Sequence, residues 1–328
     1  MKWSNRLIIM LLIGAFLLSG CISTKVTLFR SYSEPLKEYT LEGEGDGKVL
    51  MIPVKGVITS RSKNRLLYTE PGTVQEIVSH LEMAAEDKKI KVVVLQIDSP
   101  GGTVTASDIL YHEIKEFKNK TGKKVVIAMM NLAASGGYYI ALAGDEIYAH
   151  PTTVTGSIGV IFIRPDIEGL MGKIGVEADV TKSGVYKDMG SPFRKSTETE
   201  QELFQGIIDE LYGRFVGLIA ENRGLDPDQV RAIADGRIYT AQQALDLKLI
   251  DRIGYLDEAI AGAKQIAGLP DNAQVVVYRR TERANDNRYY TATGKGGGGS
   301  PKLIDLGIPE YMNVPDAGFY YLWTPGVE

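Results

Sequence analysis

The sequence predicts an α/β protein built on a parallel sheet that crossover helices cover. Apolar runs with the length and composition of buried strands occur at residues 49–58, 91–97, 123–130 and 146–150. Amphipathic helical patterns lie between them, at residues 74–87 and 108–117. Strands and helices that alternate at these lengths are typical of a parallel sheet, because parallel neighbours need a crossover connection.

The first element along the chain is a targeting segment. Lys2 and Arg6 precede residues 7–18, an uncharged and mostly apolar run of twelve residues. A helix that spans a bilayer needs about twenty such residues. The pattern therefore predicts a cleaved signal peptide over residues 1–20.

The segment ends in a lipid-attachment signal. Residues 18–21 (LSGC) resemble the bacterial lipobox, in which small residues precede a cysteine that receives lipid. Cys21 is the only cysteine of the chain, so no disulfide can form within one chain. We expect lipid on Cys21 to hold the mature protein at the extracytoplasmic face of a membrane, on the periplasmic side or at the cell surface. An uncleaved anchor helix with an incidental cysteine is the alternative.

Behind this anchor we expect a membrane-proximal linker over residues 21–47 and one catalytic domain over residues 48–282. Loss of residues 1–20 removes two basic side chains and lowers the formal net charge from −4 to about −6. Such a balance offers no basic patch for nucleic acid. No phosphate-binding loop or metal-ligand cluster stands out, so we expect no cofactor and no metal.

A helical segment closes the domain. The longest predicted helix covers residues 198–223, and one of its faces carries Leu203, Ile207, Leu211, Phe215, Leu218 and Ile219. We interpret this face as core or subunit interface rather than as part of a cofactor site. Shorter helices are predicted over residues 226–234, 241–246 and 257–267.

The carboxyl-terminal part differs in composition. Residues 283–300 are predicted to be a flexible linker, and its GGGGS end at 296–300 is either natural or engineered. Residues 301–328 form a tail whose apolar stretch at 319–323 favours a docked position. The tail is expected either to pack on its own domain or a neighbouring subunit, or to lie in a peptide groove as an extended strand.

Candidate chemistry lies at two turns that follow strands. Ser135 stands among small residues at 131–137 (NLAASGG), directly after the apolar run at 125–130. A second strand ends in the turn at 98–102 (DSPGG). Free backbone N–H groups at such turns can hold an oxyanion, which indicates acyl transfer. Ordinary strand-to-helix turns are the alternative interpretation.

A serine nucleophile needs a base, and the chain has three histidines. His80 and His112 lie in charged helical stretches and are expected on solvated faces, whereas His150 ends a strand after the serine turn. A lysine made neutral by burial is the other base used with serine. The candidate segment, residues 180–188, is expected to follow a strand over 176–181.

Four motifs occur in order and together resemble a known family. They are residues 97–102 (IDSPGG), 134–139 (ASGGYY), 155–160 (TGSIGV) and 182–188 (KSGVYKD). So arranged, residues 48–262 resemble the signal peptide peptidase A family of bacterial serine-lysine peptidases, peptidase family S49, in its single-domain lipoprotein form. Residues 236–244 and 249–251 resemble its closing helix pair, although Lys248 stands where the family usually has glycine.

The resemblance implies a Clp/crotonase-type fold with repeated β-β-α units, followed by a long helical segment. It implies Ser135 as nucleophile and Lys187 as general base, whereas spacing alone does not separate Lys187 from Lys182 or Lys195. Backbone N–H groups of Gly136 and of the Gly101-Gly102 turn would then form the oxyanion hole.

The resemblance further implies a homo-oligomeric ring, in which neighbouring subunits contribute to one working site. A monomer whose sheet joins serine and lysine is the alternative. We expect a membrane-anchored serine endopeptidase that degrades remnant signal peptides and similar apolar peptides through an acyl-enzyme. A crotonase-like acyl-CoA enzyme and an inactive membrane scaffold are the alternatives.

Overall fold

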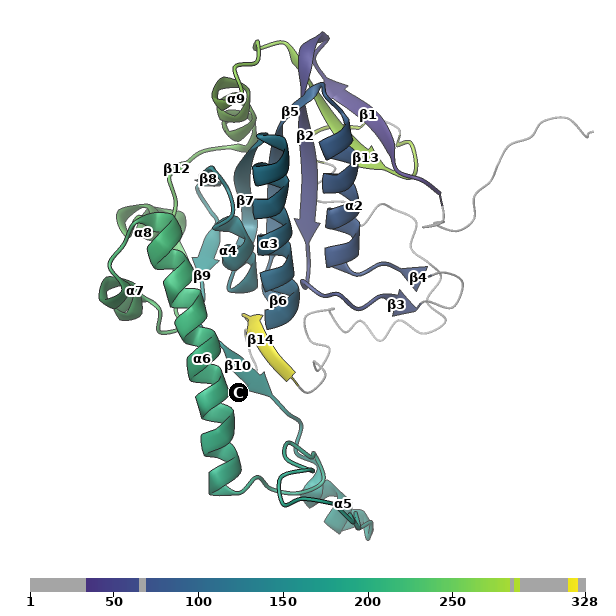
Figure 1. Ribbon diagram of the computed structural model, residues 1–328, viewed down its shortest axis with the longest axis vertical. Helices are drawn as coiled ribbons and strands as arrows, with labels where there is room; N and C mark the ends of the chain where they lie inside the picture. Colours follow the sequence, from purple (N-terminus) through teal and green to yellow (C-terminus); the bar gives the residue numbers. More distant parts are fainter. Residues whose placement is uncertain (1–33, 65–68, 284–285, 290–317, 324–328) are drawn as a thin grey trace, which may run out of the picture.

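The computed structural model describes residues 34–64, 69–283, 286–289 and 318–323 (Figure 1). The predicted signal peptide, Cys21 and most of the predicted linker 283–300 lie outside these residues. None of the helices in the described ranges combines the length and the apolar character that crossing a bilayer requires.

A large sheet forms the centre of the described structure. Its main path runs β1-β13-β2-β5-β7-β8-β12, and β9 and β11 continue it beyond the end of β7. Parallel neighbours make up the middle: β2 (Gly45–Lys55), β5 (Ile90–Ser99), β7 (Lys124–Ala134) and β8 (Glu146–Ala149). They coincide with the four expected apolar runs, and the predicted parallel sheet is confirmed.

Shorter or flanking strands complete the sheet. They are β13 (Ala273–Arg279), parallel to β2, β1 (Lys37–Glu42), antiparallel to β13, and β12 (Arg252–Ile253), parallel to β8. β9 (Val154–Gly156) lies beside β7 and pairs with β11 (Ile238–Thr240). A separate two-stranded ribbon consists of β3 (Lys63–Asn64) and β4 (Thr69–Glu70).

Helices cover both faces of the sheet, as Figure 1 shows. One face carries α2 (Thr73–Glu86), α3 (Val104–Thr121) and α4 (Gly136–Ala141), and the other carries α9 (Leu256–Ile266). Alternate residues of β5 serve the two cores: Val93 and Leu95 belong to the first, and Val92 and Val94 to the second. Burial on both faces explains why these strands are apolar throughout instead of alternating with polar residues.

An arm projects from the sheet body (Figure 1). We use this name for β10 (Ile161–Ile163), α5 (Glu168–Ile174), residues 175–197 and the first half of α6 (Glu198–Arg223). The second half of α6 packs on the core through Phe215, Val216 and Ile219. Shorter helices α7 (Pro227–Ile233) and α8 (Ala241–Asp246) follow, close to their predicted bounds.

The limits of α6 match the prediction of residues 198–223 because both ends carry capping signals. Thr197 accepts from the Glu200 N–H at 3.2 Å, and the Glu200 carboxylate accepts from the Thr197 N–H at 2.9 Å. Gly224 ends the helix with φ 62°, a conformation that glycine adopts without strain.

One predicted strand is wrong. Residues 176–181 form no strand, because they lie exposed on the arm where no sheet edge is available to pair with them. Strand-like composition alone therefore did not produce a strand there.

The prediction of a solvated His80 is also wrong. Its side chain is buried on α2, 6.1 Å from the Tyr278 ring, and lies 3.5 Å from Glu76. His80 shares a face with Ile77, Leu81 and Ala84, at the spacing of an apolar helix stripe. The helical periodicity therefore indicates that His80 is buried, whereas the charged residues next to it in the sequence led to the wrong prediction. His112 is exposed, as predicted.

The described part of the tail is a strand, β14 (Gly318–Leu322). It lies between β10 and β6 (Gly101–Thr103) and pairs antiparallel with both. The tail therefore docks on its own chain as an extended segment, beside the glycine turn singled out by the sequence.

Candidate active site

Ser135 occupies a strained turn between β7 and α4. Its φ of 51° and ψ of −115° lie in a region that residues with a side chain rarely adopt. Two hydrogen bonds hold the turn: the Ser135 N–H donates to the Gly156 carbonyl at 2.7 Å, and the Tyr139 N–H donates to the Ser135 carbonyl at 2.9 Å. Such a sharp strand-to-helix turn is typical of catalytic nucleophiles, and the surrounding bonds maintain its strain.

The glycine turn after β5 lies against this serine turn. Gly101 has φ 101°, and its N–H donates to the Ser99 hydroxyl at 3.1 Å. Ser99 in turn donates to the Gly56 carbonyl at 2.7 Å. Backbone bonds from Ile58 to Gly101 and from Thr103 to Ile58, at 2.8 and 3.0 Å, fix the next residues. The turn is therefore rigid before any ligand arrives.

The predicted oxyanion-hole residues meet beside Ser135. A Cβ placed on Gly136 would overlap the Ser107 hydroxyl and lie 3.1 Å from the Gly102 nitrogen. A Cβ on Gly101 would lie 2.7 Å from the Gly136 nitrogen. Only glycine fits at these positions. Because the Gly101 N–H already bonds Ser99, the N–H groups of Gly102 and Gly136 are the best-placed donors for an oxyanion.

Lys187 lies elsewhere in the chain. It is exposed in residues 175–197 of the arm, which Figure 1 shows projecting away from α4. Among the described residues, no basic side chain hydrogen-bonds the Ser135 hydroxyl. The structure therefore brings Ser135, Gly101, Gly102 and Gly136 together but does not bring Lys187 to them within one chain.

An ion-pair network anchors the loop that carries Lys187. Arg194 donates to Asp188 at 2.8 Å and to Glu200 at 2.8 Å. Glu200 is only 2% exposed, and the hydrogen bond from Arg194 lowers its pKa to about 2. The same arginine holds the pKa of Asp188 below its usual range. Lys187 thus precedes a carboxylate that is tied to the start of α6.

The other candidate bases are Lys182, Lys195 and His150. Lys182 pairs with Asp188 at 2.7 Å, and Lys195 is exposed on the arm. His150 contacts the Thr152 hydroxyl at 2.9 Å and packs edge-on against Tyr255. None of the three contacts Ser135.

One buried amine, that of Lys55, was not predicted from the sequence. Lys55 ends β2 opposite Asp98, and its nitrogen is buried without a hydrogen-bond partner among the described residues. Burial lowers the pKa of Lys55 to about 8 and raises that of Asp98. Strand alternation puts Lys55 on the same face as Met51, toward α9, whereas Gly136 packs against α3 on the opposite face. The sheet therefore separates this amine from Ser135.

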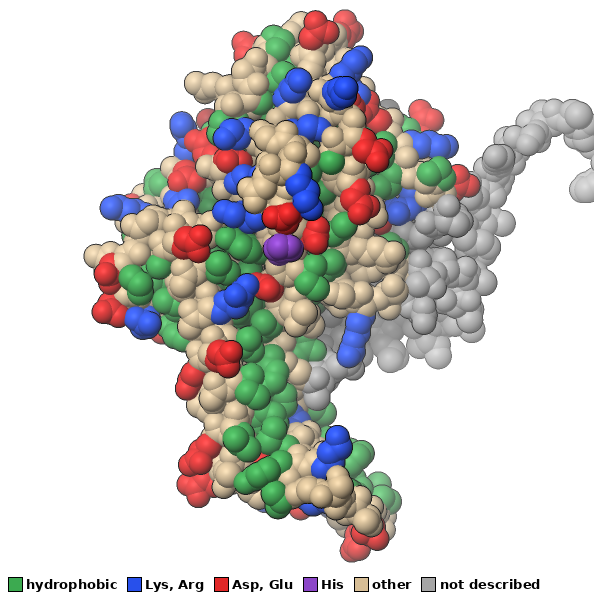
Figure 2. Space-filling model, in the orientation of Figure 1, with side chains coloured by type: hydrophobic (Ala, Val, Ile, Leu, Met, Phe, Trp, Pro, Cys, Tyr) green, Lys and Arg blue, Asp and Glu red, His purple; other side chains and the backbone are tan. Residues whose placement is uncertain are grey.

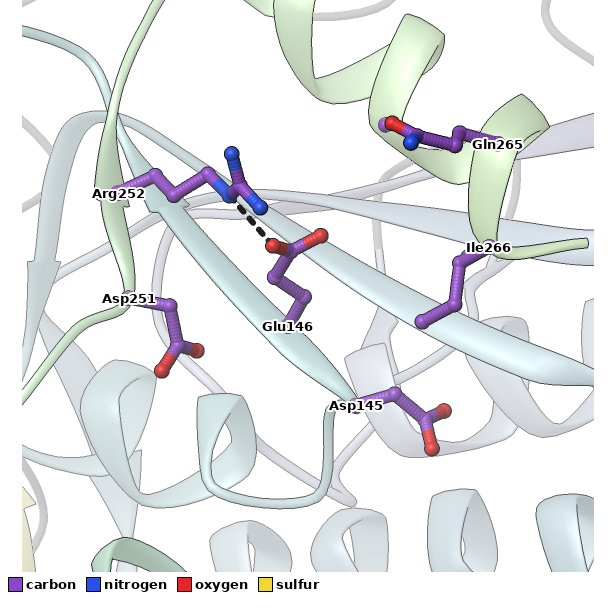
Figure 3. A pocket seen from close by; sticks show the side chains of 7 residues that line it. Asp145, Glu146, Asp251, Arg252, Gln265 and Ile266 are labelled. Atoms are coloured by element: carbon purple, nitrogen blue, oxygen red, sulfur yellow. Dashed lines mark hydrogen bonds and ion pairs between the residues drawn. The ribbon is translucent and has the colours of Figure 1, made fainter.

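A surface pocket lies at the opposite end of the sheet, before the start of β8 (Figure 3). Its charged side chains already have partners: Arg252 donates to Glu146 at 2.5 Å, and Arg223 donates to Asp251 at 2.7 Å. Asp145 accepts from the Val125 N–H at 2.8 Å. We interpret it as a structural ion-pair cluster. Among the described residues, no three His, Cys, Asp or Glu side chains gather as a metal site requires.

Comparisons with known proteins agree with this geometry. Residues 117–270 match Peptidase family S49, and residues 68–155 match Clp protease. The second match covers the glycine turn after β5 and the Ser135 turn. Together with the parallel sheet and the β5-β6-α3 unit, this match confirms the Clp/crotonase-type fold.

Curated relatives that match most of the chain also indicate a peptidase. The chain is 37% identical over 252 residues to a putative signal peptide peptidase SppA of Enterococcus faecium, covering 77% of this chain and 73% of that protein. It is 41% identical over 229 residues to a putative protease of Synechocystis, covering 70% and 78% respectively. Protease 4 of Salmonella typhi is 34% identical over 71% of this chain and 37% of that protein. The chain therefore belongs to peptidase family S49 and is a serine peptidase.

Proposed function

We propose that Ser135 is the nucleophile of this peptidase and that Lys187 of a second copy is its general base. The observation that carries the proposal is the strained Ser135 turn, with the Gly102 and Gly136 N–H groups beside it. The exposed position of Lys187 on a projecting arm supports a lysine donated to a neighbour.

The chemistry follows from these groups. The Ser135 oxygen attacks the scissile carbonyl carbon while the neutral Lys187 amine takes the hydroxyl proton. The resulting oxyanion accepts hydrogen bonds from Gly102 and Gly136. Lys187 then protonates the departing amine, the peptide C–N bond breaks, and an ester remains on Ser135. Water, deprotonated by the same lysine, hydrolyses the ester and restores both residues.

Exposed apolar side chains support a homo-oligomer. On α6, Leu203 and Ile207 are 43% and 38% exposed, although they share the face that is buried farther along the helix. Further exposed apolar residues on the arm are Leu170, Ile174, Val176, Val180, Val185, Tyr186 and Phe193. Figure 2 shows apolar side chains gathered along α6 and the arm. Contiguous patches of this kind mark interaction sites, and a closed ring of identical chains would cover them.

The proposed substrates are remnant signal peptides and similar apolar segments. β6 and β10 lie on either side of a position that holds an extended strand, which is the conformation in which a peptide gains backbone hydrogen bonds on both sides. Lipid on Cys21 would keep the enzyme at the extracytoplasmic membrane surface, where released signal peptides are found.

A serine-reactive covalent probe tests the nucleophile. Wild type should be labelled at Ser135, identified by mass spectrometry of the modified peptide, and should cleave casein or an apolar peptide faster as pH rises from 6 to 9. Ser135→Ala should lose both labelling and cleavage. Cleavage that persists in Ser135→Ala would overturn the assignment.

A further inference from the structure

Lys187 lies in a stretch without helix or strand. Between α5 and α6, residues 175–197 form turns but no regular element. The Lys187 N–H donates to the Gly184 carbonyl at 3.1 Å, which closes one turn within the segment but does not connect it to the sheet body. Proton transfer needs a base at a fixed position. Contacts from outside this turn must therefore fix the segment.

The Arg194 guanidinium supplies such contacts, because it binds two carboxylates at once. Its Nε and Nη2 atoms donate to the two oxygens of Asp188 at 2.9 and 2.8 Å. Its Nη1 atom donates to one oxygen of Glu200 at 2.8 Å, and Nη2 donates to the other. Paired hydrogen bonds between a planar guanidinium and a carboxylate fix orientation as well as distance. Asp188, the residue after Lys187, is therefore held in one orientation.

Glu200 connects Arg194 to the sheet body. Its side chain is only 2% exposed, and its carboxylate also accepts from the Thr197 N–H at the start of α6. The second half of the same helix packs on the core through Phe215 and Ile219. Figure 1 shows α6 running from the arm to the body. Arg194 thus joins the segment that carries Lys187 to a helix that is fixed in the core.

Arg194 also occupies the carboxylate next to Lys187 in the sequence. Asp188 accepts from Lys182 as well, at 2.7 Å, and the bonds from Arg194 and Lys182 hold the pKa of Asp188 below its usual range. Asp188 is therefore ionised at neutral pH. Among the described residues, no acid pairs with the Lys187 amine.

A free Asp188 carboxylate would interfere with a lysine base. An ionised carboxylate that pairs with a lysine raises the pKa of the amine, and a protonated amine cannot take a proton from serine. The two cationic partners of Asp188 prevent this pairing.

We propose that Arg194 is a positioning residue for the reaction: it fixes the segment that carries Lys187 and keeps Asp188 occupied, so that the amine reaches Ser135 of a second copy unpaired. The inference rests on the proposed function, in which Lys187 is the general base. Arg194 acts through the place and the charge of the Lys187 amine rather than on the substrate.

The pH dependence of peptide cleavage by the full-length protein tests this role. The midpoint of the rise of kcat/KM with pH reports the base in the free enzyme. In Arg194→Gln the freed Asp188 carboxylate should pair with Lys187. We expect the midpoint to move up by about one pH unit and kcat at neutral pH to fall about tenfold, because that shift leaves a tenth of the neutral amine. KM should stay near wild type, since the substrate does not contact Arg194.

The double variant Arg194→Gln with Asp188→Asn separates the effect of charge from that of structure. It lacks the same arginine, but it no longer carries the carboxylate. We therefore expect the midpoint to return to the wild-type position. If Arg194 only supported the fold, the loss of a second member of the network would not restore the midpoint.

Two single variants complete the series. Arg194→Lys keeps a cation beside Asp188 but cannot bind both carboxylates in pairs of hydrogen bonds. It should keep the wild-type midpoint and lose several-fold in kcat. Arg231→Gln is the matched control, because Arg231 forms an ion pair with Asp228 at 2.6 Å on α7, and it should equal wild type in rate and midpoint. Thermal unfolding and sedimentation of each variant monitor folding and assembly.

The outcomes separate this inference from the proposed function. An inactive Lys187→Ala, together with wild-type rate and midpoint in Arg194→Gln, would overturn the positioning role alone. Near-normal activity of Lys187→Ala would overturn the proposed base, and the role of Arg194 with it. If Arg194→Gln does not fold, Arg194→Lys decides: wild-type kcat in that variant would overturn the role.

Discussion

Gly101 and Gly136 lie so close together that a methyl group on either would crowd the backbone of the other. A Cβ on Gly101 would lie 2.7 Å from the Gly136 nitrogen, and a Cβ on Gly136 would lie 3.1 Å from the Gly101 Cα. These residues belong to separate turns, after β5 and β7 respectively. Their contact sets the position of both proposed oxyanion donors relative to Ser135.

Gly136→Ala should therefore reduce kcat/KM by about 10²-fold or more, since a displaced donor stabilises the oxyanion poorly. Peptide hydrolysis measures this effect. Gly206→Ala is the control: it lies inside α6 with open space around it, and we expect normal activity and about 1 kcal/mol of added stability. Full activity in Gly136→Ala would show that this contact does not set the hole.

Two replacements of Ser135 should show the loss of the nucleophile and the backbone strain as separate effects. Ser135→Gly and Ser135→Ala should both be inactive, because each lacks the nucleophile. Glycine adopts φ 51° without steric cost. Ser135→Gly should therefore unfold at higher temperature than Ser135→Ala, and its free energy of unfolding should be about 1 kcal/mol larger. Calorimetry on the two variants makes the comparison, and a more stable alanine variant would contradict the strain.

Complementation tests the shared site. Ser135→Ala and Lys187→Ala should each be inactive alone, whereas Lys182→Ala should retain a measurable rate because Lys182 pairs with Asp188. Co-expressed Ser135→Ala and Lys187→Ala chains should regain part of the activity, since some interfaces join an intact serine to an intact lysine. Mixed oligomers that form and remain inactive would assign both residues to one chain.

Lys55→Met should stabilise the protein below pH 8. The pKa of Lys55 is about 8 in the folded chain, against an ordinary value of 10.5, so below pH 8 folding buries a charge. Between pH 8 and 10.5 the folded protein releases this proton first, and wild type gains stability relative to the variant. The difference in melting temperature should shrink over that window. Lys88→Met, at an exposed lysine, should show no such trend.

Cys21→Ser should abolish lipid attachment. Membrane fractionation should then show either uncleaved precursor or loss of the mature form, because the twelve-residue apolar run holds a bilayer less firmly than lipid chains do. A mature variant that remains bound to the membrane as wild type does would require another anchor.

Elements with strong local signals could be predicted from the sequence. The four central strands are continuous apolar runs, and α6 carries a capping box at Thr197 and a glycine stop at Gly224. The two turns that meet at Ser135 could be predicted too, since the carboxyl ends of neighbouring parallel strands share one sheet edge.

Features that depend on distant partners could not be predicted. Residues 176–181 have strand-like composition but no edge to pair with, and the burial of Lys55 follows from the packing of the sheet. The separation of Lys187 from Ser135 reflects the direction in which the arm leaves the body. Nothing in the local sequence encodes that direction.

The position of β14 has a consequence for solubility. β6 and β10 each offer a row of backbone N–H and C=O groups along a free edge, and β14 satisfies both rows. Bare edges of this kind act as templates for aggregation with any extended chain, including a misfolded copy of the same protein. Because β14 pairs with both edges, it would protect the enzyme from fibril-like self-association.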